Sequence, residues 1–205
     1  MNFFHKFTKR DLGFAVLTGL ITGIIGWRIL EFLKTPEIHG VPWVSLALII
    51  PILWILGVLL GYLLGQWLDF FNQFGKFAAI GFTNFAVTTG TLNFLLSLTS
   101  YSSGFGYFLI SAISFVVGVV SSYVWNKSWA FRSDTTPASF AEFFKFITVM
   151  LVALAVNVIV SSFVVNYIHP LAGMDANTWA NMGVVAGAAC GLIFSFVGFR
   201  TAVFK

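Results

Sequence analysis

Six long apolar segments dominate this chain of 205 residues. Each is bounded by charged or turn-forming residues and has about the 20 residues that an α-helix needs to cross a bilayer. Only 9% of the residues are charged, against roughly a quarter in an ordinary soluble domain. We therefore predict an all-α, polytopic membrane helix bundle with six spans and no room for a folded soluble domain. The segments are residues 12–33, 44–68, 77–98, 105–126, 143–168 and 179–199.

The first two segments each contain a feature that needs interpretation. Lys6, Lys9 and Arg10 precede the first segment, as in a signal peptide. The apolar stretch continues to about Leu30 and no small-residue cleavage site follows, so we interpret it as an uncleaved span. Pro51 lies inside the second segment. Neighbouring helices can satisfy a carbonyl that a proline frees, so we expect Pro51 to kink this helix rather than end it.

Basic residues gather at one side of the predicted spans. If the six helices alternate in direction, Arg28 and Lys34 lie on one side and nine basic residues on the other. Positively charged loops stay in the cytoplasm, so we expect the cytoplasmic membrane, with both termini in the cytoplasm. The net charge of +4 then faces anionic lipid headgroups, and no nucleic-acid partner is expected. The nine residues are Lys6, Lys9, Arg10, Lys76, Lys127, Arg132, Lys145, Arg200 and Lys205.

The residue sets of common catalytic sites are missing from the sequence. The histidines lie far apart, neither HExxH nor CxxC occurs, and the seven acidic residues are scattered as singles. Metal hydrolysis and paired-carboxylate catalysis therefore lack their parts. Cys190 is the single cysteine, so no intrachain disulfide is possible. We expect a protein that is not an enzyme and that uses no metal or cofactor.

A weak internal repeat covers the region from about Phe74 to Lys205. A shift of 73 residues places Lys127 on Arg200, and a shift of 69 residues places the Phe74 region on Phe143. The region therefore resembles two similar two-helix hairpins, and parallel repeats of this kind are used by transporters. We predict two domains, an N-terminal two-helix extension (residues 1–73) and a four-helix domain (residues 74–205). The first shift also aligns Gly118, Ser122, Val124 and Phe131 with Gly191, Ser195, Val197 and Phe204.

Small and polar residues recur at helical spacing within the predicted spans. Such residues let helices approach closely, so we interpret most of them as packing positions that permit, without requiring, a homo-oligomer. The faces are Gly81, Asn84, Thr88 and Thr91 in the third span; Ser111, Ser114, Gly118, Ser121 and Trp125 in the fourth; and Asn157 with Ser161 in the fifth. Glycine ladders occur in the second span (Gly57, Gly61, Gly65) and in the sixth (Gly183, Gly187, Gly191).

Two asparagines lie deep in the predicted spans. At about 1.5 Å per residue, Asn84 lies about 12 Å from Lys76, and Asn157 lies about 18 Å from Lys145. An unpaired amide at this depth costs free energy, so each needs a partner: another helix, water or a ligand.

The basic residues at the span ends have two interpretations. Lys127 and Arg200 occupy equivalent places in the repeat, where together they are positioned to hold a phosphate at the mouth of a groove. For Lys76 and Lys145 we favour the simpler role of anchors at the membrane interface. Near the opposite end of the first span, Arg28 should form a local ion pair with the residue three positions later, Glu31.

Four short motifs resemble the GtrA-like family. They are FGKFAAIGFTNF from Phe74, WNKSWAF at the end of the fourth span, FFKF opening the fifth and FRTAVF ending the sixth. The resemblance covers about residues 74–205 and implies a four-helix membrane domain that moves polyprenyl-phosphate-linked sugars, often beside a polyprenyl-phosphate glycosyltransferase. Phe199 stands where the first hairpin has its asparagine, and the first two spans are additional. By position, the resemblance implies substrate contacts at Asn84, Asn126, Lys127, Trp129 and Arg200.

We therefore expect flipping of a polyprenyl-phosphate-linked monosaccharide across the cytoplasmic membrane, for polysaccharide or glycan modification. Lys127 and Arg200 would engage the phosphate, and Asn84, Asn126 and Asn157 would meet polar atoms of the head. The expected partners are the lipid-linked sugar and membrane lipids.

Two alternatives remain open. One is a membrane anchor or scaffold for a glycosyltransferase, which would then be a partner. The other is a small multidrug-type exporter, which normally needs an intramembrane carboxylate. None of the seven acidic residues lies in the middle of a span.

Overall fold

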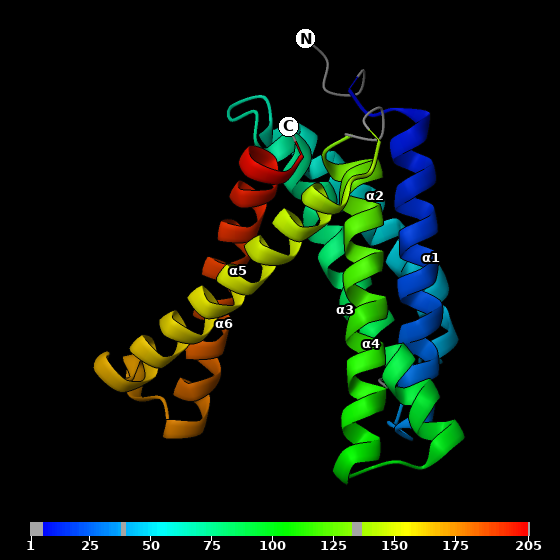
Figure 1. Cartoon of the computed structure of the whole chain (residues 1–205), viewed down its shortest axis with the longest axis vertical. Helices are drawn as coiled ribbons and strands as arrows, with labels where there is room; N and C mark the ends of the chain where they lie inside the picture. The colour runs from blue at the N-terminus through cyan, green and yellow to red at the C-terminus, as the bar shows by residue number, and fades with distance from the viewer. Residues whose placement is uncertain (1–5, 38–39, 133–136, 205) are drawn as a thin grey trace. The chain divides into compact units, whose positions relative to one another are not determined.

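The computed structural model describes residues 6–37, 40–132 and 137–204. Lys205, counted above among the basic residues, lies outside this part. The described chain folds into six long helices, with no β-strand within those ranges, which confirms the all-α prediction (Figure 1). Every helix overlaps one of the six predicted segments. The helices are α1 (Lys9–Phe32), α2 (Leu46–Leu64), α3 (Phe71–Thr99), α4 (Gly104–Trp125), α5 (Phe140–Tyr167) and α6 (Ala176–Gly198).

The described residues also form four short helical elements. Two are 3₁₀ turns, η2 (Trp43–Ser45) before α2 and η4 (Leu171–Gly173) between α5 and α6. The other two are five-residue π-helical turns, η3 (Asn126–Ala130) directly after α4 and η5 (Phe199–Val203) directly after α6. π-Helical turns are rare in proteins and often occur at functional sites.

Among the described residues, five helical segments are long and apolar enough to cross a membrane. The chain is therefore a multi-pass membrane protein. The long helix missing from this set is α3, whose 29 residues include several threonines and asparagines. It packs against α1, α2 and α4, so its polar atoms can find partners on other helices instead of facing hydrocarbon. The five segments are Lys9–Phe32, Trp43–Leu64, Gly104–Ala130, Phe140–Tyr167 and Trp179–Val203.

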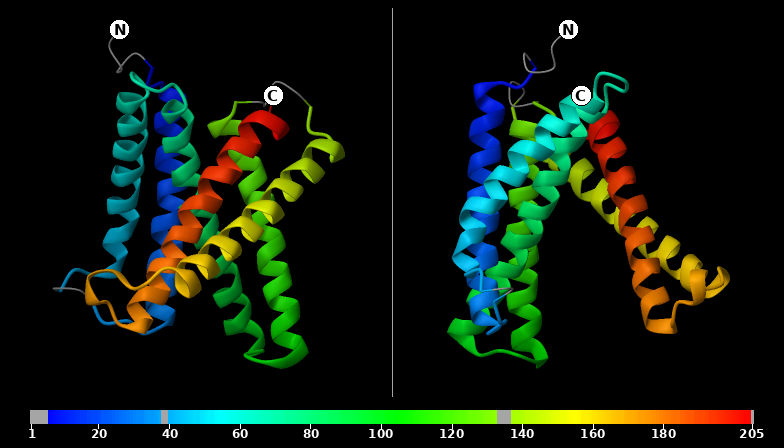
Figure 2. Two further views of the ribbon diagram at one scale, coloured as in Figure 1. Left: turned by 90° about the vertical axis from the view of Figure 1, so that its left-hand side faces the viewer. Right: turned by 180° about the vertical axis from the view of Figure 1, so that it is seen from behind.

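The chain divides into two compact units, residues 1–132 and residues 133–205. Unit 1 contains α1 to α4 with η2 and η3, and these four long helices run side by side (Figure 2). Unit 2 is the hairpin of α5 and α6 with η4 and η5. The N-terminal helix pair α1 and α2 is thus built into the same unit as α3 and α4. The division at residue 73 stays a prediction about the extent of the C-terminal four-helix domain.

Helices α1 and α2 make backbone contact at two glycines. A methyl group added at Gly19 would meet the Cα of Pro51, and one at Gly23 would meet the carbonyl oxygen of Leu46 and lie 2.9 Å from the Cα of Ala47. Only glycine allows two helices to approach this closely. As predicted, α2 continues through Pro51.

A cluster of hydroxyl and indole groups joins the first three helices within the bundle. The hydroxyl of Thr83 in α3 donates to the carbonyl of Ala79 and accepts a hydrogen bond from the indole nitrogen of Trp54 in α2 (3.3 Å). The hydroxyl of Thr22 in α1 lies 3.0 Å from that of Thr83. Thr83 is completely buried. The polar groups of α3 are therefore used to hold α1 and α2 against it.

The two predicted hairpins, α3/α4 and α5/α6, share contacts at positions that the repeat aligns. A methyl group added at Gly118 would lie 3.3 Å from the Cβ of Thr88. The residues aligned with these two are Gly191 and Asn157, and a methyl group added at Gly191 would lie 3.2 Å from the Cβ of Asn157. Each hairpin therefore crosses at the same pair of positions.

The ends of the two hairpins are also alike. The turns η3 and η5 occupy aligned positions, and in each the backbone N–H after the turn donates back to its first residue, at 3.0 Å for Phe131 and 2.8 Å for Phe204. The ring of Phe131 lies 6.2 Å from that of Phe77, and the ring of Phe204 lies 6.0 Å from that of Phe146. The structure thus confirms two similar hairpins down to individual ring contacts.

Candidate functional site at the basic end of unit 1

The end of unit 1 where α1 and α3 begin and α2 and α4 finish is called here the basic end. Its centre is Asp11, in the first turn of α1. Thr8 precedes this helix and caps it: its hydroxyl accepts from the N–H of Asp11, and its own N–H donates to the Asp11 carboxylate, both at 3.1 Å. This capping box fixes where α1 begins and holds the Asp11 carboxylate at the helix end.

The Asp11 carboxylate is completely buried and is bound from all sides. The ammonium of Lys76 in α3 lies 2.6 Å from Oδ1, and the guanidinium of Arg132 lies 3.1 Å from both oxygens. The hydroxyl of Tyr62 in α2 donates to Oδ2 at 2.9 Å, and the indole of Trp129 in η3 donates to Oδ1 at 3.2 Å. One carboxylate therefore ties α1 to α2, α3 and the end of α4.

Lys76 differs from the sequence expectation. We expected it to anchor α3 at the membrane interface, but it is only 3% exposed and its ammonium is paired with Asp11. Its charge also lies 5.1 Å from the ring centre of Tyr62, within cation–π range. The anchor interpretation is wrong for Lys76 because α1 covers this end of α3. Lys145, its equivalent in unit 2, is exposed.

The turn η3 is also covered by α1. Trp129 is completely buried, and its ring stacks on Phe14 of α1 with 5.7 Å between centroids. The guanidinium of Arg10 donates to the carbonyl oxygen of Ser128 at 2.6 Å. The indole N–H of Trp129 is already used by Asp11. Trp129 is thus placed to support neighbouring residues of η3 rather than to touch a ligand directly.

The first two residues of η3 are the predicted ligands Asn126 and Lys127. Asn126 is 1% exposed, and its amide nitrogen donates to the carbonyl of Ser122 at 2.8 Å. Its Oδ1 is buried and accepts no hydrogen bond from any residue that the structure describes. Lys127 is 8% exposed. An amide acceptor and a cation are therefore consecutive residues of one π-helical turn.

Asn84 lies deeper in unit 1, on the face of α3 that meets α4. Its Oδ1 accepts a hydrogen bond from the hydroxyl of Ser121 in α4 at 3.0 Å. One turn further along α3, Thr88 lies against Gly118. The polar faces predicted for the third and fourth spans therefore face each other, and the partner of Asn84 is another helix.

Replacing Asn84 with alanine should lower the free energy of unfolding by about 0.6 kcal/mol, and by less than about 2 kcal/mol, the range measured for hydrogen bonds between membrane helices. The measurement is thermal unfolding in detergent micelles of wild type, Asn84→Ala, Ser121→Ala and the double variant. We expect the second substitution to add little to the first. Fully additive effects would show that the two side chains do not stabilise each other.

The remaining predicted ligands, Asn157 and Arg200, belong to unit 2. The Oδ1 of Asn157 accepts from the hydroxyl of Ser161 in the same helix at 3.3 Å. Both side chains lie against Gly187 of α6, where an added methyl group would lie 2.8 Å from that Oδ1. Arg200 is exposed in η5. Unit 1 thus collects Asn84, Asn126, Lys127 and Trp129, and unit 2 carries the other two.

Sequence reasoning missed Asp11, Tyr62 and Arg132 as members of the site. The available signal was the motif Thr8-x-x-Asp11 just before an apolar segment, which predicts a capping box. That motif explains the local contacts of Asp11 but says nothing of its tertiary partners. As predicted, the exposed pair Arg28 and Glu31 forms an ion pair at 2.9 Å.

These observations define a class: a polytopic membrane protein whose core repeats a two-helix hairpin that ends in a basic π-helical turn. The family model described as "GtrA/DPMS, transmembrane domain" matches residues 76–204, more than half of the chain. The chain belongs to this family, which confirms the resemblance seen in the motifs and links it to the handling of polyprenyl-phosphate-linked sugars. Helices α1 and α2 precede the matched residues. No curated protein and no solved structure matched the chain.

Proposed function

We propose that this protein translocates a polyprenyl-phosphate-linked monosaccharide across the cytoplasmic membrane, with both termini in the cytoplasm. The positive-inside rule places the basic end of unit 1 on the cytoplasmic side. The isoprenoid tail of such a lipid can remain in hydrocarbon, while the charged, hydroxylated head cannot cross it cheaply. The protein therefore has to supply polar contacts to the head and performs no covalent step.

The observation that carries the proposal is the position of Asn126 and Lys127 as consecutive residues of η3. The Asn126 Oδ1 accepts no hydrogen bond from the described residues, and a sugar hydroxyl is a donor of the kind it can accept. The Lys127 ammonium supplies a cation for the phosphate as a point charge. Arg200, at the equivalent position of η5, is proposed from the repeat as a further phosphate-binding residue.

The deeper polar residues support the same function. Asn84 and Ser121 hydrogen-bond across α3 and α4, and Asn157 and Ser161 lie on α5. A sugar head that exchanges hydrogen bonds with these residues leaves few polar atoms unpaired in the membrane. In this proposal Trp129 acts indirectly, because its ring and its N–H hold η3 against α1.

Replacing Lys127 with alanine should slow flipping about tenfold or more, because a hydrogen bond to a charged group contributes about 1.5–3 kcal/mol. The assay uses liposomes that contain purified protein and a radiolabelled polyprenyl-phosphate-linked monosaccharide. It measures the fraction of sugar that becomes accessible with time to a membrane-impermeant oxidant.

The matched control is Lys34→Ala, which removes an exposed cation from the opposite end of unit 1 and should flip at the wild-type rate. Equal rates in wild type and Lys127→Ala would remove Lys127 from the mechanism. Absence of flipping by the wild type, together with co-purification of a polyprenyl-phosphate glycosyltransferase, would instead favour the role of membrane anchor.

A further inference from the structure

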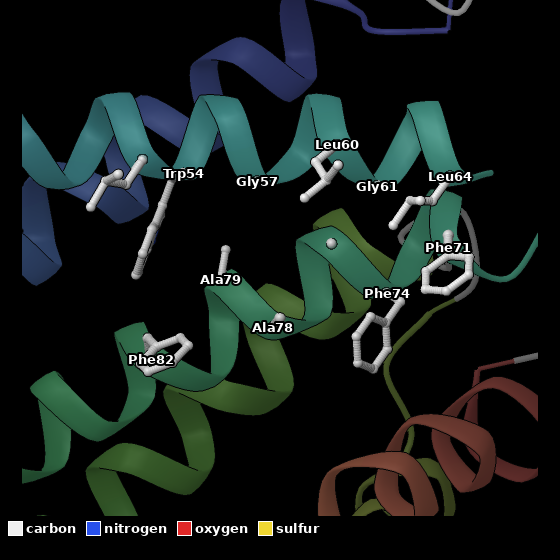
Figure 3. A pocket seen from close by; sticks show the side chains of 12 residues that line it. Trp54, Gly57, Leu60, Gly61, Leu64, Phe71, Phe74, Ala78, Ala79 and Phe82 are labelled. Carbon is white, nitrogen blue, oxygen red and sulfur yellow. The ribbon is translucent and has the colours of Figure 1, made fainter. Parts of the chain in front are cut away.

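An apolar groove follows the contact between α2 and α3 in unit 1. Its volume is about 280 Å³, and every side chain that lines it is apolar or is the hydrogen of glycine, apart from the indole N–H of Trp54. That N–H is already bonded to Thr83. We refer to this feature as the α2/α3 groove. Figure 3 shows Trp54 and Leu60 reaching from α2 toward α3, with Phe74 and Phe82 on the α3 side.

The groove has the length of a short piece of lipid chain. On α2 its lining runs from Leu53 to Leu64, and on α3 from Phe71 to Phe82. Eleven helical steps of about 1.5 Å give about 16 Å along either helix. The groove starts at the basic end, where Leu64 and Phe71 lie, and follows the helix axes into the membrane.

Two glycine contacts set the separation of the two helices. A methyl group added at Gly61 would lie 2.8 Å from the carbonyl oxygen of Phe71, and one added at Gly75 would lie 2.9 Å from that of Gly57. The aromatic rings of Trp54 and Phe82, with 5.8 Å between centroids, close the deep end of the groove. Trp54 is fixed by its hydrogen bond to Thr83.

Gly57 stands apart from these packing glycines. A methyl group added there would meet no atom within 4 Å, although the residue lines the groove. Glycine weakens a helix relative to alanine. At this position no neighbouring atom uses the space that a side chain would fill. Its missing side chain leaves the groove open.

The chemistry of the groove selects a hydrocarbon chain. Leu53, Leu60 and Phe82 at its rim are 48%, 53% and 62% exposed, so in a bilayer the rim faces lipid. The lining offers no free hydrogen-bonding group for the polar headgroup of a lipid or for a polar drug. Flat ring faces suit a chain with repeated methyl branches and double bonds, which presents stiff, broad surfaces to the rings.

A line of aromatic rings connects the groove with η3. Phe74 lines the groove and lies 6.4 Å from Phe77, which lies 6.2 Å from Phe131. The N–H of Phe131 donates to the backbone carbonyl of Asn126. A series of ring contacts therefore links one lining residue of the groove, Phe74, to the turn that carries the proposed ligands of the head.

We propose that the α2/α3 groove binds the isoprenoid tail of the lipid substrate while η3 holds its phosphate. This inference rests on the proposed function. It adds a binding site to that function, because α2 precedes the residues that the family model matches. The additional helix pair thus supplies a tail site that residues 76–204 do not form by themselves.

The test is binding of polyprenyl phosphate to the full-length protein in detergent micelles, measured by native mass spectrometry. Gly57→Leu fills the groove and should weaken binding about tenfold or more, the loss expected when a few methylene groups are no longer buried. Leu60→Trp, at the exposed rim, should act in the same direction. Gly13→Leu is the matched control, because an added methyl at Gly13 in α1 also meets no atom within 4 Å.

A second lipid separates the tail from the phosphate. Phosphatidic acid with straight saturated chains carries a phosphate but no isoprenoid, and its binding should be the same in wild type and Gly57→Leu. Equal weakening of both lipids would overturn the isoprenoid assignment. Unchanged binding of polyprenyl phosphate by both Gly57→Leu and Leu60→Trp would overturn the groove as a tail site.

The Lys127→Ala variant distinguishes failure of this inference from failure of the proposed function. Loss of polyprenyl phosphate binding in Lys127→Ala, with normal binding in Gly57→Leu, removes the tail site and keeps the proposed head site. Loss in Gly57→Leu, with normal binding in Lys127→Ala, keeps the tail site and removes Lys127 as a phosphate ligand.

Discussion

Asp11→Ala is expected to lower the free energy of unfolding by about 3–5 kcal/mol, the cost of removing one partner from a buried ion pair. The carboxylate is completely buried and neutralises Lys76, which is itself only 3% exposed. Without it, a buried ammonium has no counterion at 2.6 Å, and the donor groups of Tyr62 and Trp129 lose their acceptor. Thermal and denaturant unfolding in detergent micelles, followed by circular dichroism, measures the change.

Two further variants show whether the loss comes from the buried pair. Glu31→Ala breaks the exposed pair with Arg28 and should cost less than about 1 kcal/mol. Adding Lys76→Met to Asp11→Ala removes the uncompensated charge and should recover part of the lost stability, because an apolar replacement of a buried pair is often tolerated. A double variant that is less stable than Asp11→Ala would contradict this explanation.

The positions of the helices follow closely from the sequence, because the surrounding lipid restricts which residues a membrane span can contain. A segment that faces hydrocarbon has to be apolar along most of its length. For this reason the predicted segment 105–126 and the observed α4, Gly104–Trp125, nearly coincide. Interactions within one helix were equally accessible: Arg28 and Glu31 are one turn apart, and their ion pair was predicted from that spacing alone.

The partners of Asp11 could not be predicted in the same way. Asp11 and Lys76 are 65 residues apart in sequence and lie on different helices, and their contact exists only because α1 packs along α3. An isolated acidic residue beside several basic ones has many possible partners at a membrane interface. Tyr62 is hidden for a further reason, since an aromatic residue at a span end is usually an interface anchor.

The repeat predicted which positions are equivalent but not how their surroundings differ. Lys127 and Arg200 hold the same place in η3 and η5, yet Lys127 is 8% exposed whereas Arg200 is exposed. In unit 1, α1 covers η3 through Arg10 and Phe14. Within unit 2 only α5, α6 and their short turns pack together. Helix α1, which contacts η3 at Ser128 and Trp129, is not part of the repeat.

Gly23→Ala is expected to lower the free energy of unfolding by as much as about 3 kcal/mol, the upper part of the usual range for overpacking. The added methyl would meet the carbonyl oxygen of Leu46 and lie 2.8 Å from the carbon of that carbonyl. Backbone atoms cannot move aside as a flexible side chain can, so α1 and α2 would have to separate. The same unfolding measurement in micelles detects the loss.

The control lies one turn further along the same helix, facing the same neighbour. A methyl group added at Gly26 would lie 3.7 Å from the Cδ1 of Leu46, an ordinary contact with the end of a flexible side chain. Gly26→Ala should therefore be neutral or stabilising by up to about 1 kcal/mol, because alanine favours the helix more than glycine does. The opposite signs expected for two glycines three residues apart make the comparison decisive: equal effects would mean that α1 and α2 are not held in backbone contact at Gly23.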